Sequence, residues 1–168
     1  MLVFRTMKRD EILAAIDAAF REEPRPAHFV REPNHCEECA DHEAVLQATS
    51  REAISLAEVG NPGWDPLCYV TDGAFRHLLP GLARLALGSG EDYYLDQFLF
   101  HLETGRINAL NPAQAEAVAA LLEYVRANMA DEIEAEMNAA EFDRVMGLLS
   151  ELAGPQPLLD GTVGFTHL

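Results

Sequence analysis

Residues 111–129 read NPAQAEAVAALLEYVRANM and carry the clearest helix signal in the chain. Asn111 is a favourable N-cap, and Pro112 follows at the first helical position, where its missing N–H costs nothing. Apolar residues then recur every three or four positions, which places them on one face of a helix. They are Val118, Leu121, Leu122, Val125 and Met129. The stretch predicts a long amphipathic helix with one buried face.

The residues after this helix predict a break and a last helix. An acidic run occupies residues 131–136. Acidic side chains stabilise the positive N-terminal end of a helix, so we expect one helix to end and another to begin near residues 128–130. A continuous helix to about residue 137 stays open as the alternative. A final apolar stripe with helical spacing covers residues 142–152.

Helical spacing also marks segments in the first two thirds of the chain. These are residues 7–22, 36–49 and 91–102. Residues 72–87 keep this spacing through Pro80, and we expect a break there because proline removes an intrahelical hydrogen bond. The stretch 67–70 is the only one that resembles a strand. The pattern therefore predicts an all-α domain of about six helices, with at most one short strand near residues 67–70.

A stretch rich in Pro and Gly lies between the predicted helical segments 36–49 and 72–87. Residues 61–64 read NPGW, with Pro62 and Gly63 at the positions that a type II turn favours. We expect such a turn here, with Trp64 filling a gap in the core beside it.

Length and composition favour one globular domain over residues 1–168. Residues 1–6 are expected to be an extension, and residues 156–168 a C-terminal tail without helical periodicity. The order of apolar and basic residues at the start does not fit a secretory signal, and no apolar run is long enough to span a bilayer. A cytoplasmic location is the expectation.

The chain is strongly acidic, with 12 Lys and Arg against 28 Asp and Glu and a formal charge of −16. Such a surface repels phosphate backbones and anionic lipid headgroups, which argues against nucleic-acid and membrane binding. It suits solubility, cation binding and association with a basic protein. The oligomeric state cannot be inferred from these features.

A compact cluster of His and Cys occupies residues 35–42, which read HCEECADH. Thiolates and imidazoles are the ligands that zinc prefers, and a Cys-x-x-Cys places two sulfurs on one side of a turn or helix start. The sequence therefore predicts a metal site, with zinc as its ion. Its predicted ligands are His35, Cys36, Cys39 and His42.

The number of ligands depends on the local structure. In a regular helix, His35 and His42 would stand about 10 Å apart along the axis, too far for both to reach one ion. A helix therefore offers Cys36, Cys39 and one histidine, with the fourth ligand coming from elsewhere. A loop would let all four bind. The alternatives for the fourth ligand are His28, Cys68 and His101.

Two other chemistries are less well supported by the cluster. A redox-active cysteine pair is disfavoured because Glu37, Glu38 and Asp41 would destabilise a thiolate. The zinc deaminase pattern lacks its separate downstream P-C-x-x-C. The metalloprotease motif H-E-x-x-H is missing as well, because no second histidine follows His42 at the required offset.

Residues 61–87 read NPGWDPLCYVTDGAFRHLLPGLARLAL, a Trp-containing turn, a short hydrophobic stretch and then a Phe-Arg-x-x-Leu-Pro element. Two helix-like stretches follow, EDYYLDQFLFHL at 91–102 and LNPAQAEAVAALLEYV at 110–125. These motifs resemble a family of small uncharacterised bacterial proteins that are acidic and helical. The resemblance covers about half the chain and implies a helical fold. The family has no assigned activity, so the resemblance implies no mechanism.

These observations favour a non-enzymatic cytoplasmic protein, stabilised by zinc, whose acidic surface binds another protein. One alternative is an immunity-like or nucleic-acid-mimicking inhibitor that occupies the basic cleft of its target. Another is a small metalloenzyme that uses Cys36, Cys39 and a histidine, with an open position for water. That enzyme would need a carboxylate such as Glu37 or Glu43 as its base.

Overall fold

Residues 7–154 are described by the computed structural model of the chain, and they form eight α-helices. The helices are α1 (Arg9–Ala19), α2 (Glu37–Gln47), α3 (Leu56–Val59), α4 (Asp72–Leu85), α5 (Leu95–Glu103), α6 (Pro112–Asn128), α7 (Ala130–Ala135) and α8 (Ala139–Ala153). Four short 3₁₀ helices connect them: η1 (Pro62–Trp64), η2 (Pro66–Cys68), η3 (Gly90–Asp92) and η4 (Arg106–Ala109). The all-α prediction is confirmed for this part of the chain, while the predicted extension 1–6 and tail 156–168 lie outside it.

The strongest sequence signal forms as expected. The Asn111 side chain accepts a hydrogen bond from the N–H of Gln114 at 2.9 Å, and the Gln114 side chain accepts one from the N–H of Asn111 at 3.1 Å. This reciprocal capping starts α6 with Pro112 as its first residue. The predicted break near 128–130 is also confirmed, because Met129 leaves helical geometry between α6 and α7.

The predicted number of helices was too low. Eight helices lie in residues 7–154 instead of about six. The difference comes from short elements such as α3 and α7, which have four and six residues. A segment this short cannot repeat an apolar period, so periodicity does not reveal it as a helix of its own.

The expected break at Pro80 was wrong, because α4 runs without interruption through it. Pro80 and Gly81 are both buried on a helix that also buries Leu78, Leu79 and Leu82. A Cβ atom at Gly81 would collide with the carbonyl oxygen of Arg51, so the glycine allows the preceding loop to lie directly against the helix. Burial of this apolar face offsets the roughly 3 kcal/mol that an interior proline costs.

The stretch 67–70 does not form a strand. Its first residues belong to η2, and Val70 makes a single antiparallel bridge with Val30. The Asp65 side chain accepts a hydrogen bond from the N–H of Leu67 at 2.9 Å, which starts a 3₁₀ turn where apolar composition alone predicted extended backbone.

The expected type II turn was wrong too. Gly63 is not among the glycines with positive φ, which that turn requires, and residues 62–64 form η1. Asn61 caps this 3₁₀ turn by accepting a hydrogen bond from the N–H of Gly63 at 2.9 Å. Trp64 is 46% exposed and does not fill the core.

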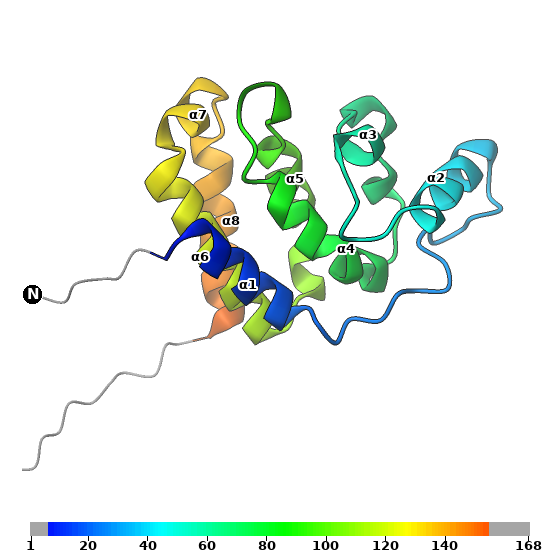
Figure 1. The fold of residues 1–168 in the computed structure, drawn as a ribbon, viewed down its shortest axis with the longest axis horizontal. Coiled ribbons are helices and arrows are strands. Elements are labelled where there is room, and N and C mark those ends of the chain that lie inside the picture. The colour runs from blue at the N-terminus through cyan, green and yellow to red at the C-terminus, as the bar shows by residue number, and fades with distance from the viewer. Residues whose placement is uncertain (1–6, 155–168) are drawn as a thin grey trace, which may run out of the picture.

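The helices form an elongated row (Figure 1). Helices α6 and α8 pack side by side at one end, and α1 packs across α6 and α4. Helix α5 contacts both α8 and α4 in the middle of the row, and α2 lies at the opposite end, against η2. Within residues 7–154, no helix has the length and apolarity needed to cross a bilayer.

Candidate metal centre

The predicted cysteine cluster lies at the N-terminal end of α2. Cys36 is the N-cap of the helix, and its sulfur accepts a hydrogen bond from the N–H of Cys39 at 3.4 Å. The helix therefore begins directly after Cys36, and both cysteine side chains lie at its N-terminal end. His35 precedes Cys36, and the first helical turn brings Cys39 beside Cys36.

Three of the four predicted ligands lie together. The Sγ atoms of Cys36 and Cys39 are 3.3 Å apart. One ligand atom each from His35, Cys36 and Cys39 lies within 4.8 Å of the other two. His35 and Cys36 are exposed and Cys39 is 5% exposed, so the group opens to solvent on one side. We call these three residues the α2 cluster.

The two thiols of the α2 cluster differ electrostatically. The N–H of Cys39 and then the side chain of His35 lower the pKa of the Cys36 thiol. The hydrogen bond with Cys36 and burial raise the pKa of the Cys39 thiol. The argument that nearby carboxylates disfavour a thiolate therefore fails at Cys36, because the helix start supplies a stronger opposing effect.

The fourth predicted ligand, His42, lies outside the α2 cluster. It is 1% exposed, and its Nε2 lies 3.4 Å from Oε1 of Glu38. Its ring stacks on Tyr69 with 5.2 Å between the ring centroids, and Trp64 packs on it at 4.9 Å. Of the two alternatives, the structure therefore matches the helical one, in which one histidine, here His35, lies with the two cysteines.

None of the alternative fourth ligands joins the α2 cluster either. His28 Nδ1 lies 3.2 Å from Oε1 of Glu43. Cys68 and His101 instead form a second group with Asp65, in which the three ligand atoms again lie within 4.8 Å of one another. We call this group the η2–α5 cluster. Asp65 was not among the predicted ligands, and its position as a cap before a Pro-Leu-Cys turn is the one sequence signal that points to it.

Glu43, one of the two carboxylates considered as a base, has a structural position. Its Oε2 accepts hydrogen bonds from the N–H groups of Phe29 and Val30, at 2.9 and 2.7 Å. Its Oε1 accepts one from the Gln47 side chain at 2.9 Å. The carboxylate thus ties the connection after α1 to α2, and it is not free to act on a substrate at the α2 cluster.

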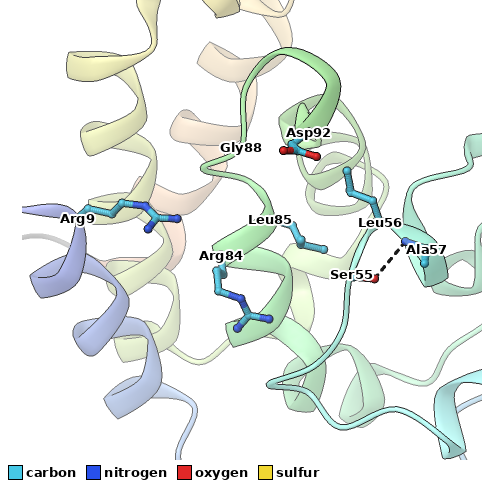
Figure 2. Close-up of a pocket in the computed structure, with 8 residues that line it drawn as sticks. All are labelled: Arg9, Ser55, Leu56, Ala57, Arg84, Leu85, Gly88 and Asp92. Atoms are coloured by element: carbon cyan, nitrogen blue, oxygen red, sulfur yellow. Dashed lines mark hydrogen bonds between the residues drawn. The ribbon is translucent and has the colours of Figure 1, made fainter.

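A cleft of about 370 Å³ lies elsewhere, between Arg9, the start of α3 and the end of α4 (Figure 2). Two of its polar side chains already serve the fold: Ser55 Oγ accepts a hydrogen bond from the N–H of Ala57 at 3.2 Å, and Arg84 donates to the carbonyl oxygens of Glu52 and Ile54. No cysteine or histidine lines it. The chemistry of the described residues is concentrated in the two clusters instead.

Comparisons of the chain with protein-family models, with curated proteins and with solved structures found no match. The family resemblance drawn from residues 61–125 therefore stays a prediction. The function has to be argued from the side chains alone.

Proposed function

We propose that this chain is an acidic metal-binding protein in which His35, Cys36 and Cys39 hold Zn²⁺, and that its acidic surface binds another protein. The observation that carries the metal-binding part is the 3.3 Å separation of two free sulfurs, with an imidazole nitrogen within 4.8 Å of them. Two sulfurs and one imidazole bind zinc in preference to Mg²⁺ and Ca²⁺, which are harder ions and favour oxygen ligands.

The ion would have one open position. Structural zinc sites usually have four protein ligands, whereas three ligands leave a place for water or for an incoming group. Since His42 is stacked against Tyr69 and held near Glu38, the fourth ligand comes from solvent or from a bound partner. The zinc would then take part in partner binding as well as fixing the start of α2.

The acidic surface supports a basic protein as that partner. The formal charge of the chain is −16, and Glu32, Glu37 and Asp41 are exposed around the α2 cluster. Complementary charge speeds association and disfavours acidic partners. An inhibitor that occupies the basic cleft of a nuclease or toxin is one form of this proposal, and a gene for such a protein beside this one would identify the first partner to test.

The metal-binding part is tested on protein purified without a metal-affinity step. Zinc is measured by elemental analysis, and alkylation of each cysteine is mapped by mass spectrometry with and without added Zn²⁺. Zinc is expected to protect Cys36 and Cys39 from alkylation. The protection should be lost in Cys36→Ser and Cys39→Ser and weakened in His35→Gln.

His42→Gln is the matched control, because it removes a nearby histidine that lies outside the α2 cluster. It should leave the protection of Cys36 and Cys39 unchanged. Equal alkylation of both thiols with and without zinc would overturn the proposal. Formation of a Cys36–Cys39 disulfide under mild oxidation, together with no zinc binding, would identify a redox pair instead.

The partner-binding part is tested with polylysine as a basic probe. Binding should weaken with rising salt and should decrease when exposed acids near the cluster are neutralised in a Glu32→Gln/Glu37→Gln variant. Neutralising Glu116 and Glu123, exposed acids on α6, is the matched control. If both variants lose the same affinity, the interaction is with net charge and not with the surface around the α2 cluster.

A small metalloenzyme is the second candidate, because three protein ligands with an open position also suit metal-bound water. Glu37 is an exposed carboxylate next to Cys36 in sequence, whereas Glu43 accepts hydrogen bonds from two backbone N–H groups and from the Gln47 side chain. Hydrolysis of activated esters by the zinc-loaded protein, lost in Glu37→Gln with zinc still bound, would favour this candidate over the binding protein.

A further inference from the structure

The η2–α5 cluster joins two parts of the chain that are far apart in sequence. Asp65 is the N-cap of η2 and Cys68 is its last residue, whereas His101 lies on α5. Nε2 of His101 lies 2.7 Å from Oδ2 of Asp65, and the side chains of both residues are almost fully buried. Cys68 is exposed and completes the group, with all three ligand atoms within 4.8 Å of one another.

The fold holds this group in place. Oδ1 of Asp65 accepts a hydrogen bond from the N–H of Leu67 at 2.9 Å, so the carboxylate is fixed by the turn that it caps. Arg106 donates to the carbonyl oxygen of Leu67 at 2.8 Å and clamps the same turn from η4. Asp65, and His101 through its contact with Asp65, are thus positioned before any ion arrives, which lowers the entropy cost of binding.

The group faces a surface cleft of about 340 Å³ that Asp65 and Cys68 help to line. Gln97 lines the cleft as well, and its Oε1 is buried without a hydrogen-bond partner among residues 7–154. The hydroxyl of Tyr94 is the other such buried atom in this part of the chain. Burial raises the pKa of Tyr94, and the negative charges of Asp65 and Asp96 raise it further.

A buried polar atom without a hydrogen-bond partner is costly, and the Gln97 oxygen at this cleft calls for an explanation. A hydrated metal ion in the cleft supplies one, because ion-bound water can donate a hydrogen bond to the Gln97 oxygen. We propose that Asp65, Cys68 and His101 form a second metal site, selective for Zn²⁺ or another borderline divalent ion and separate from the α2 cluster.

The donor set and the charge balance both fit such an ion. Carboxylate oxygen, thiolate and imidazole are each ligands that zinc accepts, and three protein ligands leave a position for water. One carboxylate and one thiolate balance the two positive charges of the ion, and the carboxylates of Asp96 and Glu141 line the same cleft. Mg²⁺ and Ca²⁺ are disfavoured because both prefer all-oxygen surroundings.

The experiment uses Co²⁺ as the probe, in the full chain with Cys36→Ser and Cys39→Ser. This double variant leaves Cys68 as the only thiol among the chain's three cysteines. Cobalt should then give thiolate-to-metal charge-transfer absorption that comes from the η2–α5 cluster alone. Adding Cys68→Ser should abolish the absorption, and adding His101→Gln should weaken cobalt binding by at least about tenfold.

His77→Gln is the matched control, because His77 is a buried histidine outside both clusters. In the double-variant background it should leave the cobalt signal unchanged. The proposal is overturned if the folded double variant gives no charge-transfer absorption, or if that absorption survives Cys68→Ser. Far-UV circular dichroism establishes that each variant is folded.

If the double variant does not fold, Cys68→Ser alone decides the question. It should bind one metal ion fewer than the unsubstituted chain, with Cys36 and Cys39 still protected from alkylation. An unchanged stoichiometry overturns the second site. Because each cluster is read through its own cysteines, failure of this site and failure of the proposed α2 site give different results.

Discussion

The two clusters contain similar ligands but are built in opposite ways. The α2 cluster takes its three residues from a window of five, 35–39, and two of them are exposed. The η2–α5 cluster spans a separation of 36 residues between Asp65 and His101, and both of those side chains are buried. One site is a property of a helix start, and the other exists only when the tertiary structure has formed.

This contrast has a consequence for stability. Ligands that are close in sequence can bind an ion in the unfolded chain, which reduces the stabilisation that the ion gives to the folded state. Ligands separated by dozens of residues cannot gather without folding. The η2–α5 cluster should therefore couple metal binding to folding more strongly than the α2 cluster does.

The largest expected effect is the loss of Asp65 from the metal-free protein. Asp65→Ala removes the cap of η2 and leaves the buried His101 ring and the Leu67 N–H without their partner. Leaving a buried polar group without its partner costs about 1–3 kcal/mol for each group. Urea denaturation with a chelator present measures the free energy of unfolding.

Glu52→Ala is the control for this substitution, since Glu52 also pairs with a basic side chain, that of Arg51, but its own side chain is 73% exposed. An exposed pair contributes at most about 1 kcal/mol. The contrast between a buried and an exposed pair breaks down if the Asp65 and Glu52 variants lose the same stability.

The second prediction compares the stabilisation by zinc at the two clusters. An ion that binds only the folded state stabilises it by about 2.7 kcal/mol when its free concentration is about a hundredfold above the dissociation constant. Cys68→Ser should remove more of the zinc-dependent increase in Tm than Cys36→Ser/Cys39→Ser does. Differential scanning calorimetry with and without zinc provides the measurement.

A synthetic peptide covering residues 33–44 sharpens this comparison. It should bind cobalt through Cys36 and Cys39 with measurable affinity, because all three ligands lie within it. A peptide that does not bind would show that the α2 cluster also depends on the tertiary fold. The difference between a local site and a folded-state site would then disappear.

The third prediction concerns how α2 is held to the rest of the chain. Glu43→Gln replaces a charged acceptor of two backbone N–H groups, and hydrogen bonds to a charged group contribute roughly 1.5–3 kcal/mol. The variant should be less stable at neutral pH by an amount in this range. The free energy of zinc binding at the α2 cluster should change less than the free energy of unfolding, since Glu43 is not in the cluster.

The pH dependence of this effect follows from the pKa of Glu43. Burial raises that pKa, but hydrogen bonds from Gln47 and Val30 outweigh it, and the net direction is below the ordinary value of 4.5. A lowered carboxyl pKa stabilises the fold above about 4.5, and this stability is lost as pH falls through the folded-state pKa. Glu43→Gln should remove that acid-dependent loss. An unchanged acid limb in the denaturation midpoint would contradict the assigned hydrogen bonds.

Local chemistry decided which parts of this structure the sequence could predict. Capping and periodicity located α6 and the break at Met129, because both depend on residues adjacent in the chain. The start of α2 at Cys36 follows the same rule, which is why two cysteines and one histidine could be placed together in advance.

Long-range packing decided the features that were missed. Pro80 stays within a helix because the loop at Arg51 and the buried face of α4 hold it there. Cys68 and His101 were considered only as ligands for the α2 cluster, because spacing along the chain does not show that they lie close to each other and to Asp65 in space. A site assembled from η2 and α5 requires knowledge of how those elements pack.

The smallest expected effect tests the region between the clusters. Trp64 is the only tryptophan in the chain and directly precedes Asp65 in sequence. Its side chain is 46% exposed and packs on His42. Trp64→Phe should change stability by no more than about 0.5 kcal/mol, since the residue is not in the core. In the unsubstituted chain, cobalt should quench Trp64 fluorescence from the η2–α5 cluster, and this quenching should persist in Cys36→Ser/Cys39→Ser and fall in Cys68→Ser. Quenching that instead disappears with Cys36 and Cys39 would show that the α2 cluster alone binds the ion, because Trp64 would then be reporting on its contact with α2.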